Sequence, residues 1–165
     1  MRFALVTDVH FGPAARYAGK LRKLTHLAEE LTRTVAREIA ERHRPELLVN
    51  LGDVIEDASR EEDRAHYREF LAAIAGARTP LLHVAGNHDQ VHLTGDLREL
   101  WGRAGPLYGS WDVGGVHLAT LCTRFQDGVE ITVPEEQIRW LAQDLGATAL
   151  PTVVLLHHPL AEMDL

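Results

Sequence analysis

The chain has 165 residues, of which 45% are hydrophobic and 25% charged, and it carries a formal net charge of −7. This composition is ordinary for a globular protein, and the length is enough to bury a core, so we expect one domain over residues 1–165. The acidic balance disfavours nucleic acid and anionic membranes as partners. No apolar run approaches the roughly 20 residues of a membrane-spanning helix. A single cysteine and a strand pattern directly after Met1, in place of a signal peptide, favour a cytoplasmic protein.

The first half of the chain alternates between short apolar runs and longer amphipathic stretches. The runs predict strands and the stretches predict helices, which gives a strand at 3–6, a helix over 20–43, a strand at 47–51, a helix from Ser59 to about Ala75, and a strand at 81–85. Pro45 ends the first helix because proline disfavours helical conformation in the residue before it. This order is typical of a parallel sheet with crossover helices.

The pattern changes in the second half. Residues 108–113 and 116–123 flank Gly114-Gly115 and predict a β-hairpin. Pro134 is expected at the first position of a helix that buries Ile138, Leu141 and Leu145, together with Trp140. A last strand is predicted at 152–156. The fold class is therefore mixed α/β, with parallel and antiparallel pairing.

Polar motifs follow four of the predicted strands. In chain order they are Asp8-Val9-His10, Gly52-Asp53, Gly86-Asn87-His88-Asp89 and His157-His158-Pro159. Because the carboxyl ends of strands in an α/β sheet meet at one edge, where ligands usually bind, we expect these side chains to converge. Each motif alone has residue types that are common in turns and helix caps. Four such motifs, each after its own strand, favour a functional site.

The residue types indicate a metal centre. Oxygen and imidazole ligands without thiolate suit Mn, Fe, Zn, Ni or Co. Asp8 and His10 can turn toward one ion, and the two oxygens of Asp53 can bridge two cations. Asn87 offers an amide oxygen and His157 a nitrogen ligand.

Two metals roughly 3.5–4 Å apart can bind a hydroxide and clamp a phosphate for in-line attack. His88 is then expected to act as a catalytic residue that protonates the leaving oxygen or stabilises transition-state charge. Asp89 is expected to orient its imidazole. Asp57 either supports the site or prepares the helix at Ser59. His83, His117 and Cys122 lie inside strands, and we expect them to be packed or hydrogen-bonded rather than ligands.

The order of these motifs resembles the calcineurin-like metallophosphoesterase superfamily, and the match runs from Asp8 to His158. The resemblance implies a four-layer αββα sandwich. It implies that Asp8 and His10 bind the first metal, that Asp53 bridges, and that Asn87 and His157, in preference to His158, bind the second. The hairpin and the helix after it are similar to two branches, the cyclic-nucleotide and glycerol phosphodiesterases and the manganese-dependent ADP-ribose/CDP-alcohol pyrophosphatases.

One motif of that superfamily, Gly-His-x-His, is absent from the sequence. We therefore expect part of a longer protein, with C-terminal strands missing and more hydrophobic sheet exposed. The expected function is hydrolysis of a phosphodiester, phosphoanhydride or phosphomonoester of a small molecule. The alternatives are a non-catalytic interaction module, or a site completed by self-association or by a C-terminal segment. Side chains considered for substrate contact are Arg16, Tyr17, His92 and Arg124.

Overall fold

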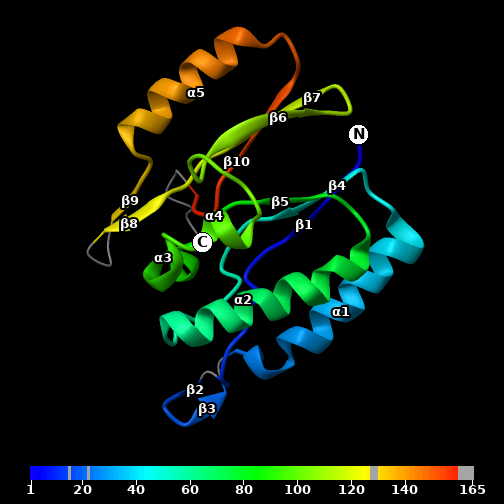
Figure 1. Cartoon of the computed structure of the whole chain (residues 1–165), viewed down its shortest axis with the longest axis vertical. Helices are drawn as coiled ribbons and strands as arrows, with labels where there is room; N and C mark the ends of the chain where they lie inside the picture. Colours follow the sequence, from blue (N-terminus) through cyan, green and yellow to red (C-terminus); the bar gives the residue numbers. More distant parts are fainter. Residues whose placement is uncertain (15, 22, 127–129, 160–165) are drawn as a thin grey trace.

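Two three-stranded sheets form the centre of the molecule (Figure 1). The computed structural model describes the chain apart from residues 15, 22, 127–129 and 160–165, and describes only the backbone of residues 16, 17, 125, 126 and 130. In the first sheet β1 (Phe3–Val6), β4 (Leu47–Asn50) and β5 (Leu81–His83) are all parallel. In the second sheet the central strand β7 (Val116–Thr120) is parallel to β10 (Thr152–Leu155) and antiparallel to β6 (Gly109–Val113). The predicted strands and both kinds of pairing are confirmed.

Helices lie outside the two sheets (Figure 1). Helices α1 (Ala28–Glu38) and α2 (Arg60–Ile74) pack on each other and cover the outer side of the first sheet, while α5 (Glu135–Ala147) lies beyond the second. Two short helices, α3 (Asn87–Leu93) and α4 (Leu97–Leu100), follow β5. This is the αββα arrangement implied by the resemblance. No helix in the described part of the chain is both long and apolar enough to cross a bilayer.

Two short hairpins were not predicted from the sequence, and one of their strands, Lys20–Leu21, lies where the helix over 20–43 was expected to begin. They pair β2 (Arg16–Tyr17) with β3 (Lys20–Leu21), and β8 (Arg124–Gln126) with β9 (Glu130–Thr132). Strands of two or three residues are too short to show the alternation by which longer strands are recognised.

The predicted helix ends were partly right. Ser59 caps α2 as expected, because its Oγ accepts a hydrogen bond from the backbone N–H of Glu62 at 3.3 Å. The helix expected over 20–43 instead begins with a 3₁₀ turn at Thr25–Leu27 and ends in a π-helical turn, Ile39–His43. It begins late because Lys20–Leu21 pairs as a strand. Pro134 is the N-cap of α5 rather than its first residue.

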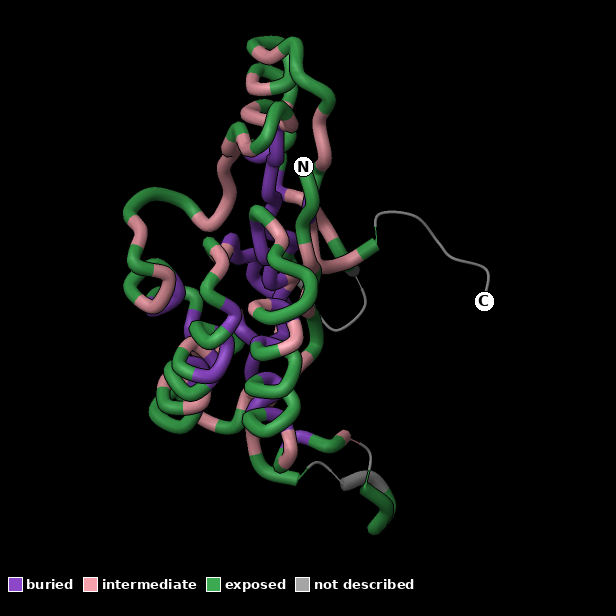
Figure 2. The backbone as a smooth tube through the Cα atoms, turned by 90° about the vertical axis from the view of Figure 1, so that its right-hand side faces the viewer, coloured by how far each residue is buried: buried purple, intermediate pink, exposed green. Residues whose placement is uncertain are grey.

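Buried side chains form two clusters, one on each side of the first sheet (Figure 2). The larger cluster joins that sheet to the helices and includes Phe11, Tyr67 and Phe70. The smaller one lies between the two sheets, where Val49 and Leu118 are fully buried. The strand ends that carry the polar motifs are thus fixed by packing on both faces of the sheet.

The predicted buried stripe of α5 is wrong at two positions. Ile138 and Leu145 are 47% and 38% exposed, and the α5 tube at the top of Figure 2 contains almost no buried residue. Gln137 is the buried side chain of this helix, and its amide exchanges hydrogen bonds of 2.8 Å with the backbone N–H and C=O of Cys122. Apolar residues at three- and four-residue spacing identify an amphipathic helix. In α5, however, the hydrogen bonds of Gln137 determine which face of the helix is packed.

His117 supplies the second polar attachment of α5. This buried imidazole lies between two carboxylates, with Nδ1 2.6 Å from Asp112 Oδ1 and Nε2 2.8 Å from Asp144 Oδ2. Asp144 also accepts a hydrogen bond from Ser110 at 2.7 Å. The hydrogen bonds to Asp144 and Asp112 raise the pKa of His117 above its usual value of 6.5. The imidazolium therefore ties α5 to the hairpin of β6 and β7.

We expect this attachment to weaken in alkaline solution. A histidine whose pKa is raised by folding stabilises the folded state fully below the unfolded value, and this stabilisation is lost as pH rises through the folded pKa. The difference in unfolding free energy between the wild type and His117→Gln should therefore shrink as the pH rises above the usual histidine pKa of about 6.5. Urea denaturation at several pH values measures it, with the exposed His43→Gln as the control. A difference that is constant with pH would contradict the role assigned to His117.

Candidate metal centre

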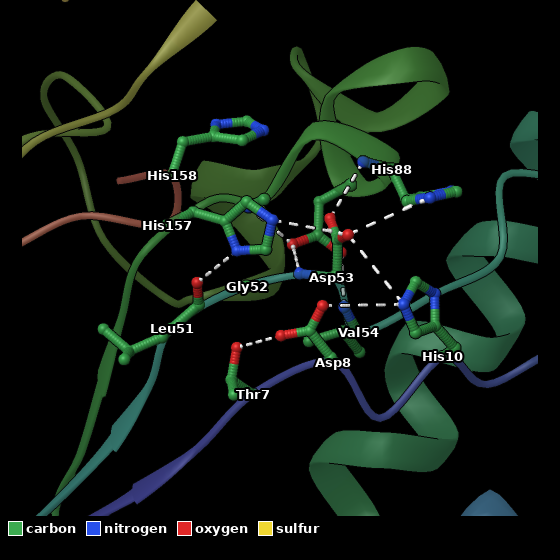
Figure 3. Close-up of polar contacts among 12 residues, drawn as sticks. Thr7, Asp8, His10, Leu51, Gly52, Asp53, Val54, His88, His157 and His158 are labelled. Atoms are coloured by element: carbon green, nitrogen blue, oxygen red, sulfur yellow. Dashed lines mark hydrogen bonds and ion pairs between the residues drawn. The ribbon is translucent and has the colours of Figure 1, made fainter. Parts of the chain in front are cut away.

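The three parallel strands of the first sheet deliver their motifs to one edge. Asp8 and His10 follow β1, Asp53 follows β4, and His88 follows β5. His157 arrives at the same place from the end of β10 in the second sheet. Figure 3 shows Asp8 and the three imidazoles arranged around the Asp53 carboxylate. The predicted convergence of the four motifs is what the structure shows.

Backbone hydrogen bonds hold the first two motifs against each other. The N–H of Asp8 donates to the Gly52 carbonyl at 3.0 Å, and the N–H of His10 donates to the Asp53 carbonyl at 3.1 Å. Asp8, His10 and Asp53 all have positive φ, at 55°, 47° and 53°. Such left-handed conformations cost about 1–3 kcal/mol each outside glycine and persist where the surrounding structure fixes them, often at functional sites. Strain is thus concentrated at three of the predicted ligands.

The second and third motifs touch through their glycines. A Cβ built on Gly52 would overlap the backbone of Gly86, and one built on Gly86 would overlap the backbone nitrogen and Oδ1 of Asp53. Gly52 also has a φ of 104°, which favours glycine. The bare backbones let the two loops approach closely enough to place Asp53 beside His88.

One oxygen, Oδ2 of Asp53, is the focus of the imidazoles. It lies 3.4 Å from Nε2 of His157 and 3.9 Å from Nε2 of both His10 and His88. The other oxygen, Oδ1, accepts a hydrogen bond of 3.0 Å from the backbone N–H of His88. Asp53 is buried, so its orientation is fixed.

A separate acceptor lies beside the Nδ1 atom of each of these imidazoles. Nδ1 of His157 donates to the Leu51 carbonyl at 2.9 Å, Nδ1 of His10 lies 2.9 Å from Glu56 Oε2, and Nδ1 of His88 lies 3.2 Å from Asp57 Oδ1. A partner on Nδ1 fixes ring orientation and leaves Nε2 free to coordinate, as is usual for metal-bound histidine. This applies to His157 and His10, whereas the contact of His88 Nδ1 with Asp57 is not a hydrogen bond. The sequence did not single out Glu56 or Leu51, and it left the role of Asp57 open.

Protonation in the metal-free protein follows these contacts. Burial, aided by the Lys23 ammonium, lowers the pKa of His10. Burial also disfavours the charged forms of Asp53 and His157, but their mutual hydrogen bond and attraction outweigh it, lowering the pKa of Asp53 and raising that of His157. Asp53 is thus held in the ionised form that a metal requires, and metal binding would displace the proton that Asp53 favours on His157.

The spacing of the donor atoms suits shared metal ions. Metal–nitrogen and metal–oxygen bonds of about 2.0–2.2 Å place two donors on one ion roughly 3–4 Å apart. The distances to Asp53 Oδ2 fall in that range, as does the 3.8 Å between His10 Nε2 and Asp8 Oδ1. Among the described residues, Asp8, His10 and Asp53 offer ligand atoms that all lie within 4.8 Å of one another. The donor set and geometry therefore fit a metal centre.

Asn87 and His158 complete the neighbourhood. Asn87 is the half-buried first residue of α3 and lines a cavity beside the site together with His88 and Asp57. His158 turns away from Asp53, and its Nδ1 lies 2.8 Å from Thr123 Oγ1 (Figure 3). The structure thus places His157, rather than His158, against Asp53.

Asp89 does not lie where we expected it. Its buried carboxylate accepts hydrogen bonds from the backbone N–H groups of Gly86, Asp53 and Val54 at 2.8–3.0 Å. Burial raises the pKa of Asp89 to about 6 in spite of these bonds. The expectation that Asp89 orients the His88 imidazole is therefore corrected. Asp89 joins the two loops, and Asp57 is the carboxylate beside His88.

The side chains set aside by the sequence analysis lie in the core. His83 is stacked on Trp101 with ring centroids 5.2 Å apart, and burial lowers its pKa to about 3. Burial raises the pKa of the Cys122 thiol to about 11. His117 binds two carboxylates on the far side of the second sheet. None of these three contributes to the centre.

The four side chains considered for substrate contact do not all lie near the centre. Nδ1 of His92 lies 2.7 Å from the buried Asp63, so His92 serves the packing of α3 on α2. Arg124 is exposed and lines the cavity beside His88. The side chains of Arg16 and Tyr17 lie outside the described residues.

The fold and the convergent side chains define the class of αββα sandwich proteins with carboxylate and imidazole groups gathered at the strand ends (Figure 3). More narrowly, the chain belongs to the calcineurin-like phosphoesterase family, whose model matches residues 1–164. The family indicates a metal-dependent phosphoester hydrolase, as the resemblance implied.

Two curated relatives are similar over about seven-tenths of the chain. A probable cyclic nucleotide phosphodiesterase of Synechococcus is 32% identical over 70% of this chain and 43% of its own length. One of Fibrobacter succinogenes is 27% identical over 69% of this chain and 42% of its own length. The matched region thus spans less than half the length of either relative.

Solved structures share the fold at low sequence identity. A dimetal phosphatase from Danio rerio covers 96% of this chain, and the match covers 70% of that protein, with a TM-score of 0.76 and 15% identity. A purple acid phosphatase from yellow lupin (Lupinus luteus) seeds matches 89% of this chain and 28% of its own, with a TM-score of 0.55 and 12% identity.

Proposed function

We propose that this protein hydrolyses a phosphodiester with two divalent metal ions at the centre around Asp53. The observation that carries the proposal is the arrangement of three Nε2 atoms within 3.9 Å of one Asp53 oxygen. Their Nδ1 atoms each lie beside another acceptor. Family membership and the names of the two curated relatives favour a phosphodiester among the phosphate esters.

The ligands divide between two positions. Asp8 and His10 would hold one ion, Asn87 and His157 the other, and Asp53 would bridge them. A pair of ions in such a site supplies Lewis acid stabilisation of the phosphate and an activated water for in-line attack. Their identity is left open, because carboxylate and imidazole accept several transition metals.

The chain's own residues would handle the proton and the orientation of the ligands. Nδ1 of His88 lies 3.2 Å from the Asp57 carboxylate, with no hydrogen bond between them. His88 would donate a proton to the leaving oxygen as the phosphorus–oxygen bond breaks. Glu56, 2.9 Å from His10 Nδ1, would keep Nε2 of His10 turned toward the metal.

The test measures hydrolysis of bis(p-nitrophenyl) phosphate with added Mn²⁺, Fe²⁺, Zn²⁺, Ni²⁺ or Co²⁺. Loss of a general acid lowers rates by about 10²–10⁴-fold, so we expect kcat/KM to fall by that factor in His88→Ala. The exposed His26→Ala serves as control and should match the wild type. Metal binding measured by calorimetry without hydrolysis under any condition would favour the non-catalytic alternative, and full activity of His88→Ala would reject the role of His88.

A further inference from the structure

An apolar cavity of about 480 Å³ opens directly beside the first metal position. Asp8 and His10 line one end of it, and the rest runs between α1, the end of β1 and α2. Ligand pockets are typically concave, roughly 300–1,000 Å³ in volume and mostly apolar, with a few polar groups. This cavity has that size and character, and it shares residues with the centre already described.

The wall of the cavity is hydrocarbon. Val6 comes from β1, Ala28, Leu31 and Val35 come from α1, and Phe70 comes from α2. Leu31 and Val35 are 51% and 42% exposed although they belong to the apolar stripe of α1. An apolar helix face therefore borders an open cavity instead of packing against the sheet.

Thr32 brings one available polar group into the cavity, because its buried hydroxyl has no hydrogen-bond partner among the described residues. The hydroxyl of Thr25 donates a hydrogen bond to the Pro13 carbonyl at 2.6 Å. The Lys23 ammonium lies 2.9 Å from Glu56 Oε2 and 3.3 Å from His10 Nδ1, which places it at the end nearest the metal position. A nucleobase would bring several donors and acceptors into the cavity, and the Thr32 hydroxyl could bond to one of them while the others lost their hydration without replacement, at a considerable penalty. A hydrocarbon group has no such penalty.

We propose that this cavity holds an alkyl group of the substrate, so that the protein prefers phosphate esters that carry a hydrocarbon chain. The inference rests on the proposed function, which places the phosphate at Asp8 and His10. From there a chain attached to the phosphate enters the cavity between α1 and β1. Each methylene moved from water to an apolar wall improves affinity by about fourfold.

The test compares the binding of n-butyl phosphate and n-octyl phosphate to the whole chain by calorimetry, with and without Mn²⁺. We expect octyl phosphate to bind at least tenfold more tightly. Ala28→Phe fills the cavity and should remove this gain, so that the two esters bind with similar affinity. Leu31→Glu alters an exposed residue of the rim, so it should fold normally and reduce the octyl affinity alone. Leu145→Glu, at an exposed leucine of α5, is the matched control and should bind as the wild type does.

Each outcome decides the proposal. Equal affinity for the two esters, or an octyl gain that persists in Leu31→Glu, would overturn it. Tighter binding of 3′,5′-cyclic AMP than of octyl phosphate, lost in Ala28→Phe, would assign the cavity to a nucleobase instead. Hydrolysis of bis(p-nitrophenyl) phosphate is measured in parallel. If the protein hydrolyses this substrate but binds the two esters equally, the inference about the cavity is wrong and the proposed function stands. If octyl phosphate binds more tightly but no hydrolysis is seen, the proposed function is wrong and the cavity still binds an alkyl chain.

Discussion

Replacement of Asp53 by asparagine is expected to lower kcat/KM for bis(p-nitrophenyl) phosphate by about a thousandfold or more. Metal catalysis contributes several kcal/mol of transition-state stabilisation, and each 1.36 kcal/mol corresponds to tenfold in rate. Asp53 Oδ2 is the atom on which His10, His88 and His157 converge. An amide in its place removes the negative charge between the two metal positions. Kinetics and metal binding by calorimetry should both report the loss.

Asparagine is chosen because it separates an effect on metal binding from an effect on folding. Its carbonyl oxygen can still accept the hydrogen bond that the backbone N–H of His88 donates to Asp53 Oδ1. We therefore expect the metal-free variant to fold, with its unfolding free energy lowered by the loss of the ion pair between Asp53 and His157. Asp112→Asn changes an exposed carboxylate on β6 and should leave both activity and metal binding intact. Wild-type activity in Asp53→Asn would reject the two-metal mechanism.

The positions of the metal ligands followed from the sequence because they depend on strand ends. The runs before Asp8, Asp53 and His88 are short, apolar and bounded by glycine or polar residues, so the strands were recognisable. Once the strands are parallel neighbours, their carboxyl ends must meet. The backbone pattern alone was therefore enough to predict that these side chains converge.

The supporting contacts were harder to predict because they join segments far apart in the chain. Asp89 directly follows His88, but successive helical residues point about 100° apart, so the two side chains of α3 diverge. Asp57 approaches His88 from a different loop, and no local pattern reveals that contact. The same limit applies to Leu51, whose carbonyl binds a histidine 106 residues later.

The exposed apolar side chains show what periodicity alone leaves undecided. Phe3 and Leu5 are 37% and 51% exposed, so β1, an edge strand of the first sheet, leaves apolar side chains uncovered. Leu31 and Val35 are apolar residues of α1 at four-residue spacing, and they border a cavity. Hydrophobic spacing predicts which residues share a face, and tertiary packing determines whether that face is covered.

Replacement of Gly86 by alanine is expected to lower the free energy of unfolding by about 2 kcal/mol, because overpacking a closely packed position typically costs 1–3 kcal/mol. The backbone of Gly86 has a φ of −86°, which alanine adopts freely, so the effect is purely steric. The added Cβ would overlap the backbone nitrogen and Oδ1 of Asp53. Relief requires the loop after β4 to move away from α3, which shifts Asp53 relative to His88.

Gly86→Ala should therefore lose metal affinity and hydrolysis together with stability, although it changes no ligand. Gly146→Ala is the matched control. Gly146 lies within α5, and no atom would lie within 4 Å of its added Cβ. Alanine there should raise the unfolding free energy by about 0.5–1 kcal/mol and leave metal binding unchanged. Urea denaturation and metal calorimetry on both variants test the contact between the two loops, and unaltered metal affinity in Gly86→Ala would show that Asp53 is positioned independently of it.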